Sequence, residues 1–123
     1  MNKQGLSPHV AIYKFPVTAI SSIANRLSGL YLSGVFVGYG MSHLVGFEID
    51  DHYERLSGYK RSIFDISMLL PMTYHTLGGV RHFLWDKYPS LLTNVKVARS
   101  SYALFGVTLG TSIITERYLN SKP

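Results

Sequence analysis

The sequence predicts an all-α protein whose single domain crosses a membrane with three helices, and two observations predict it. Charged residues make up 15% of the 123 residues, against roughly 25% in an average soluble domain. Three segments contain no Asp, Glu, Lys or Arg: residues 27–47, 66–80 and 100–115. A membrane-spanning helix needs about 20 mostly apolar residues, so the first segment qualifies alone and the others need one charged residue each. A soluble helical domain with buried core helices is the alternative.

The distribution of basic residues predicts which ends of these helices face inward. Residues 1–26 contain Lys3, Lys14 and Arg26 and no acid, and the connection before the third apolar segment is also mainly basic. The connection between the first two segments is richer in acids, and the positive-inside rule places basic connections on the inner side. We therefore expect the N-terminus on the matrix or cytoplasmic side.

The first elements are an irregular leader over residues 1–16 and a helix over residues 18–46. Pro8 and Pro16 each bias the residue before them away from helical geometry, which predicts the leader. Gly34 and Gly38 form a GxxxG motif within the helix, a spacing that lets another helix approach closely.

The second helix is predicted over residues 62–86. Ser62 and Asp65 have the spacing of a capping box, in which side chains satisfy the free N–H groups of the first turn. Pro71 is expected to kink the helix because it removes a backbone hydrogen bond. Trp85 would then lie at the inner interface, where amphipathic aromatic residues gather.

The third helix is predicted over residues 93–118. Gly106 and Gly110 repeat the small-xxx-small spacing. Arg99 would extend its side chain to the inner surface, and Glu116 with Arg117 would mark the outer one.

His75 is the strongest candidate for chemistry. It lies ten residues after Asp65, or about 15 Å along a helix, which places it near the middle of the membrane. An ionisable residue at this depth indicates function, and imidazole is a common axial ligand of haem iron. Gly78 and Gly79 follow on the same face and would leave a notch for a porphyrin. The alternative is a histidine hydrogen-bonded to a neighbouring helix, with glycines that serve packing.

Two further groups are weaker candidates. His82 lies seven residues after His75 and suits an interface or a haem propionate better than a second haem iron. Ser22 and Arg26 share a helix face at the inner end, where a hydroxyl and a cation could hold a carbonyl or carboxylate. The alternative for Arg26 is anchoring in lipid headgroups.

Other kinds of site find no support. The absence of cysteine excludes disulfides and thiolate metal sites. The seven acids form no converging carboxylate pair, and we read His43 as structural. The pattern of basic and aromatic residues does not indicate nucleic-acid binding. No phosphate loop or nucleophile elbow is present.

Three ordered segments resemble the cytochrome b subunits of succinate dehydrogenase. Residues 6–14 (LSPHVAIYK) resemble the family leader LSPH-x-x-IY, and residues 22–29 (SIANRLSG) resemble S-I-x-H-R-x-[ST]-G. Residues 74–86 (YHTLGGVRHFLWD) resemble YH-x-x-x-G-[IV]-RH-x-x-WD. The resemblance covers most of residues 6–86, whereas the third helix matches only in character.

The resemblance implies a membrane anchor of complex II, with no catalysis of its own. It would carry electrons from succinate to ubiquinone together with a second small anchor, an iron–sulfur subunit and a flavoprotein. His75 corresponds to the family's haem b ligand, the opposite ligand coming from the second anchor. Ser22, Arg26 and the adjacent Ile23 correspond to the border of the quinone site, with Arg26 and His82 near the haem propionates.

The resemblance also implies the mitochondrial inner membrane, with a bacterial inner membrane as the alternative. One position departs from the family: Asn25 stands where a histidine usually precedes the arginine, which affects the propionate contact and the haem potential. Two other functions stay open, the anchor of a quinol:fumarate reductase and a structural anchor or assembly scaffold without haem.

Overall fold

The computed structural model describes residues 15–121, and this part of the chain is helical without strands. Its elements are α2 (Val17–Leu44), α3 (Ile49–Glu54), α4 (Tyr59–Lys87), the 3₁₀ helix η1 (Pro89–Leu91) and α5 (Asn94–Ser121). The all-α prediction is therefore confirmed. The predicted leader falls outside the described residues, apart from Phe15 and Pro16.

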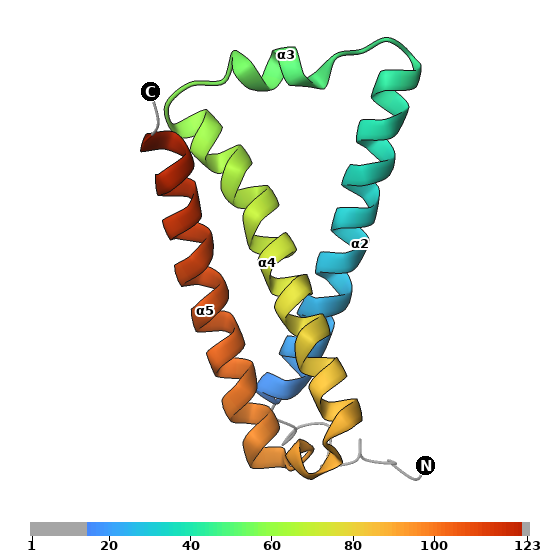
Figure 1. Cartoon of the computed structure of the whole chain (residues 1–123), viewed down its shortest axis with the longest axis vertical. Helices are drawn as coiled ribbons and strands as arrows, with labels where there is room; N and C mark the ends of the chain where they lie inside the picture. Colours follow the sequence, from blue (N-terminus) through green and yellow to red (C-terminus); the bar gives the residue numbers. More distant parts are fainter. Residues whose placement is uncertain (1–14, 122–123) are drawn as a thin grey trace, which may run out of the picture.

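Three long helices and one short crosspiece make up the arrangement (Figure 1). Helices α4 and α5 run side by side in opposite directions. Helix α2 packs against α4 near one end and diverges from it toward the other, where α3 bridges the gap. The start of α2 and the α4–α5 connection thus lie at the same end of the molecule, and α3 lies at the opposite end.

The long helices lie close to the predicted ranges, but the predicted capping box is wrong. Helix α4 begins at Tyr59 rather than near Ser62, and its N-cap, Gly58, makes no side-chain capping bond. Gly58 has a φ of 55°, a conformation that glycine adopts without steric cost. Asp65 therefore lies in the second turn of the helix. Beyond it, α4 continues through Pro71.

The distribution of buried side chains is the reverse of that in a soluble domain. Among the described residues, the buried hydrophobic side chains are Tyr74 and Leu104 alone. The buried polar or charged residues are Ser21, Ser28, Ser42, Asp65, Arg81, Ser101, Thr108, Ser112 and Glu116. Large apolar side chains such as Leu44, Phe36 and Ile114 are instead exposed. Small and polar residues thus form the helix contacts, and the apolar side chains face outward.

Hydropathy does not confirm the prediction of three membrane-spanning helices. Within residues 15–121, no helix is both long enough and apolar enough to cross a membrane.

Glycine permits close helix contact at Gly29, which the sequence did not single out, and at Gly78, for which packing was the alternative to a porphyrin notch. A Cβ at Gly29 would lie 2.6 Å from Cε1 of His75, and a Cβ at Gly78 would overlap the side chain of Asn25. The predicted GxxxG glycines behave differently: nothing lies within 4 Å of a Cβ built at Gly34, Gly38, Gly106 or Gly110. Within the described part of the chain, these two motifs therefore form no close helix contact.

Candidate functional site

His75 lies in the middle of α4 and points its ring at the backbone of α2. Its Nδ1 lies 3.0 Å from the carbonyl oxygen of Asn25 and 3.3 Å from Oγ of Ser28. A carbonyl oxygen can only accept, so Nδ1 carries the proton and donates it. The lone pair of the imidazole is then on Nε2, which makes no hydrogen bond to any described residue. This bond to α2 is the interhelical hydrogen bond that was the alternative to a haem ligand. It is also compatible with a ligand, because a metal-ligating histidine usually donates its other ring N–H to a carbonyl or carboxylate.

Gly29 gives the His75 ring its space. A Cβ at this position would come within 2.6 Å of Cε1, 3.1 Å of Nδ1 and 3.4 Å of Nε2. The first distance is far below the optimal carbon–carbon separation of about 3.5–4.0 Å. Any other residue here would displace the ring, so Gly29 helps to position the candidate ligand.

The predicted glycine notch beside His75 is half wrong. Gly78 is buried against the side chain of Asn25, so it serves contact between α4 and α2. Gly79 is exposed, with nothing within 4 Å of a Cβ built on it, and stays available as an open surface. Asn25, which replaces the expected histidine, thus contributes its carbonyl to His75 and its side chain to Gly78. Its Oδ1 is buried without a hydrogen-bond partner among the described residues.

Ser22 and Arg26 lie on the same stripe of α2 as Gly29. The spacing from Ser22 to Arg26, Gly29 and Ser33 is four, seven and eleven residues, which places all four on one helix face. Arg26 is about 4.5 Å and Ser22 about 10.5 Å along the axis from Gly29. Neither side chain forms a hydrogen bond or ion pair with another residue of the described region. The adjacent Ile23 is 43% exposed. Among the residues that the structure describes, a hydroxyl and a cation therefore lie unpaired beside the His75 contact.

The remaining histidines of the described region are not brought to this site, except for His82. His82 is exposed, and its ring packs edge-on against Trp85 with the ring centroids 5.1 Å apart. It lies on the same face of α4 as His75. His43 lies 3.9 Å from Asp50, and His52 bonds the carbonyl of Glu48. Both belong to the opposite end of the molecule. His9 lies outside the described residues.

Arg81 organises a buried network that sequence reasoning missed. Its two terminal nitrogens donate to Oγ of Ser21 (2.9 Å) and Oγ of Ser101 (3.0 Å), which joins α4 to both neighbours. Ser21 also bonds the hydroxyl of Tyr74 at 2.9 Å, and the guanidinium lies 4.4 Å from the ring of Trp85. The seven-residue spacing of Tyr74 and Arg81 places both on one face, and that was the available signal. The network fixes the α2–α4 contact that holds His75.

Two acids converge at the other end, contrary to the sequence-based expectation. The side-chain amide of Asn120 donates to Asp65 (3.1 Å) and to Glu116 (3.0 Å), and both acids are 5% exposed. The hydroxyl of Tyr53 donates to Asp65 at 2.8 Å, and this hydrogen bond raises the pKa of Tyr53 above its ordinary value. This cluster could not be predicted from the spacing of the acids, because Asp65 and Glu116 lie on different helices, α4 and α5.

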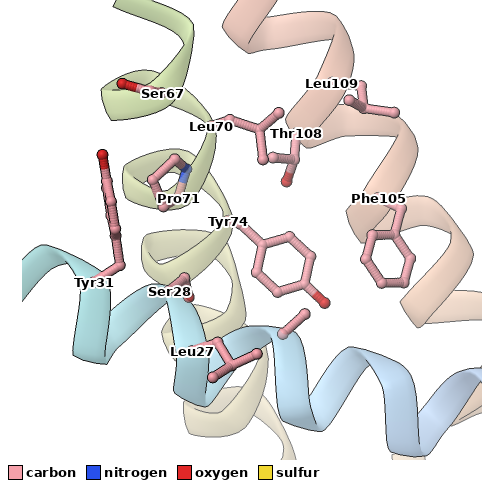
Figure 2. A pocket seen from close by; sticks show the side chains of 11 residues that line it. Leu27, Ser28, Tyr31, Ser67, Leu70, Pro71, Tyr74, Phe105, Thr108 and Leu109 are labelled. Carbon is pink, nitrogen blue, oxygen red and sulfur yellow. The ribbon is translucent and has the colours of Figure 1, made fainter. Parts of the chain in front are cut away.

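A cavity of about 530 Å³ lies on another side of α2 from Ser22. Figure 2 shows Tyr74 and Phe105 projecting into it from α4 and α5, with Leu27 and Ser28 on α2. The two rings stack with centroids 5.2 Å apart. Its walls are almost wholly apolar, and no acid, histidine or basic residue lines it. It can accommodate hydrocarbon and offers no metal ligand.

The geometry around His75 suits one half of a haem site. The residues from 15 to 121 contain no group of three metal-ligating side chains, so within this range His75 is a single imidazole rather than part of a closed metal site. A six-coordinate haem iron needs only one axial ligand from each side of the porphyrin. The oriented Nδ1–H, the available Nε2 and the open Gly79 fit that requirement. Arg26 on the adjacent stripe supplies a cation suited to a carboxylate.

Comparisons with known proteins identify the family that the chain resembles. A family model described as "Succinate dehydrogenase/Fumarate reductase transmembrane subunit" matches residues 1–115. A Dictyostelium discoideum mitochondrial succinate dehydrogenase cytochrome b560 subunit is 33% identical over 115 residues, covering 90% of this chain and 60% of the relative. The Mus musculus and Marchantia polymorpha cytochrome b560 subunits are 34% and 37% identical, each over 66% of this chain and over 52% and 66% of the relative. The chain thus spans about half to two thirds of the length of these relatives.

Proposed function

The chain belongs to the succinate dehydrogenase/fumarate reductase transmembrane subunit family, and from that premise we propose that it anchors succinate:ubiquinone oxidoreductase. In this role it supplies one axial ligand to haem b and part of the ubiquinone site. Its location is the mitochondrial inner membrane. The chain performs no catalysis alone.

The exposed apolar surface supports three membrane-spanning segments within α2, α4 and α5. Each helix has 28 or 29 residues and is therefore about 42 Å long, more than the roughly 30 Å of a bilayer core. Large apolar side chains point outward, whereas serine, threonine and glycine lie between the helices, as in membrane bundles. The start of α2 and the α4–α5 connection, which are basic, face the matrix.

His75 is the proposed axial ligand, and the hydrogen bond from its Nδ1 to Asn25 is the observation that supports this most strongly. That bond fixes the tautomer and the ring orientation and raises the basicity of Nε2. When bound, haem b supplies a one-electron redox centre between the iron–sulfur subunit and quinone. The opposite ligand would come from a second small anchor, as the resemblance to the family implies. His82 is a weaker proposal, as a neighbour of a propionate.

Ser22, Ile23 and Arg26 are the proposed border of the quinone site. The Ser22 hydroxyl can donate to a quinone carbonyl, Ile23 adds apolar contact, and the Arg26 guanidinium can stabilise negative charge on the ring oxygen or on a propionate. The proposal is supported by the lack of a polar partner for Ser22 and Arg26 within residues 15–121. The iron–sulfur subunit meets the matrix end of α2 and α4, with the flavoprotein beyond it.

The quinone assignment can be tested by enzymology on the assembled complex. Ser22→Ala and Arg26→Leu should lower ubiquinone reduction at least tenfold, while succinate oxidation by a soluble acceptor persists. Arg99→Leu is the matched control, because it removes an exposed cation near the start of α5, at the end of the bundle where α2 begins. It should leave both activities unchanged. Full quinone reduction in both site variants would refute the assignment.

A further inference from the structure

A second site is formed where α4 and α5 meet at the matrix end, on the face away from His75. Leu77, Val80 and Leu84 follow one another at three- and four-residue intervals and form one stripe of α4. His75 precedes Leu77 by two residues, about 200° around the helix. The haem face and this stripe are therefore on opposite sides of α4.

Two adjoining hollows lie along this face. The one nearer the matrix end has a volume of about 190 Å³ and is lined by Arg81, Leu84, Trp85, Leu91, Lys96 and Ser100. The other, of about 270 Å³, is lined by Leu77, Val80, Arg81, Leu84, Ser100, Ala103, Leu104 and Val107. Arg81, Leu84 and Ser100 belong to both, so the two hollows share a wall. The first is bordered by cations, and the second is a hydrocarbon groove along α4 and α5.

The positive charge of the first hollow is not neutralised within the described chain. Arg81 is 9% exposed, and its hydrogen-bond partners are hydroxyl groups, with no carboxylate within 4 Å among residues 15–121. Its Nε is buried and lacks a partner there. Lys96 uses one of its three N–H donors on the carbonyl oxygen of Ser90. Asp86, the nearest acid in the sequence, pairs with neither cation.

We propose that these hollows bind one anionic phospholipid, its phosphate beside Lys96 and Arg81 and one acyl chain in the groove between α4 and α5. Charge complementarity identifies the head group, because basic pockets between membrane helices on the matrix side recognise anionic lipids. The groove identifies the source of the phosphate, since a free phosphate ion has nothing to place in an apolar channel. Trp85 lies at the boundary, where an indole prefers to sit. The lipid stabilises the α4–α5 contact at the end where the Arg81 network joins three helices.

This inference rests on the membrane placement proposed above. The test uses the assembled complex in nanodiscs of phosphatidylcholine with a minor fraction of phosphatidylglycerol, followed by native mass spectrometry to count retained phosphatidylglycerol. Lys96→Gln should lower retention about fivefold, the effect of one basic side chain near an anionic lipid surface. Lys87→Gln removes an exposed cation at the same end that lines neither hollow, and it should change retention little. Ala103→Phe, which fills the groove without altering charge, should also abolish retention, whereas Ile114→Phe on exposed α5 surface should not.

Three results would overturn the proposal: equal effects of Lys96→Gln and Lys87→Gln, normal retention in Ala103→Phe, or displacement of the lipid by inorganic phosphate. The haem spectrum and quinone reductase activity are measured on the same samples. Normal values with no retained lipid would reject this site alone. A complex that does not enter nanodiscs would reject the membrane placement itself.

Discussion

Substitution of Gly29 by alanine tests how α2 positions His75. The added Cβ would lie 2.6 Å from Cε1 and 3.1 Å from Nδ1 of the imidazole. Normal carbon–carbon contact requires about 3.5 Å or more, so the ring must move by about 1 Å. The bond from Nδ1 to the Asn25 carbonyl is already 3.0 Å long and would exceed the usual limit of about 3.2 Å.

Two consequences follow from that displacement. Overpacking of this kind costs about 1–3 kcal/mol of stability. Loss of an orienting partner of a metal-ligating histidine typically lowers metal affinity about 10–100-fold. We therefore expect Gly29→Ala to reduce haem per complex and to broaden or shift the reduced b-type absorption band, even in preparations that assemble.

Gly34→Ala is the matched control on the same helix. Nothing lies within 4 Å of a Cβ at this position, so the change should leave haem content intact and improve helix propensity by up to about 1 kcal/mol. Haem content is measured by pyridine haemochrome and difference spectra on complexes purified in parallel. Identical haem content and spectra in the two variants would refute the proposed role of Gly29 and the orientation of His75.

Two predictions concern the polar clusters at the ends of the bundle. Ser21→Ala removes one acceptor of Arg81 and the hydrogen-bond partner of Tyr74. It should destabilise the complex by about 1–3 kcal/mol in thermal unfolding. The neighbouring Ser22→Ala should not destabilise it, and equal melting temperatures of the two variants would contradict the network. Tyr53→Phe removes the bond to Asp65 and should cost about 1 kcal/mol. Because the folded pKa of Tyr53 is raised, its stabilising bond is fully present below the ordinary tyrosine pKa of about 10 and is lost as pH rises through the folded pKa. Wild type should therefore approach Tyr53→Phe in stability at high pH, and a difference that grows with pH would contradict this assignment.

The all-α class and the long helices could be predicted because they depend on local patterns. Charge-free runs between charged connections marked the three segments. The start of α4 was predicted wrongly because Ser62 and Asp65 satisfy the local rule for a capping box, while Asp65 is in fact held by Tyr53 and Asn120. Long-range contacts of this kind cannot be read from residue spacing within one helix.

The candidate site divides in the same way. His75, Ser22 and Arg26 stood out through motif and depth, which sequence contains. The Asn25 carbonyl that orients His75 is a backbone group, and Gly29 is defined by what approaches it from α4. The Arg81 network could not be predicted because its partners, Ser21 and Ser101, lie 60 and 20 residues away in the sequence. The roles of Asn25, Gly29 and Arg81 thus depend on contacts between helices, which residue spacing within one helix does not show.

The reduced-minus-oxidised difference spectrum of the assembled complex tests the central claim most directly. We expect the b-type band of the wild type to be lost in His75→Ala and retained in His82→Ala, an exposed histidine on the same face of α4. A b-type band that persists unchanged in His75→Ala would show that the haem iron is held elsewhere and would contradict the account.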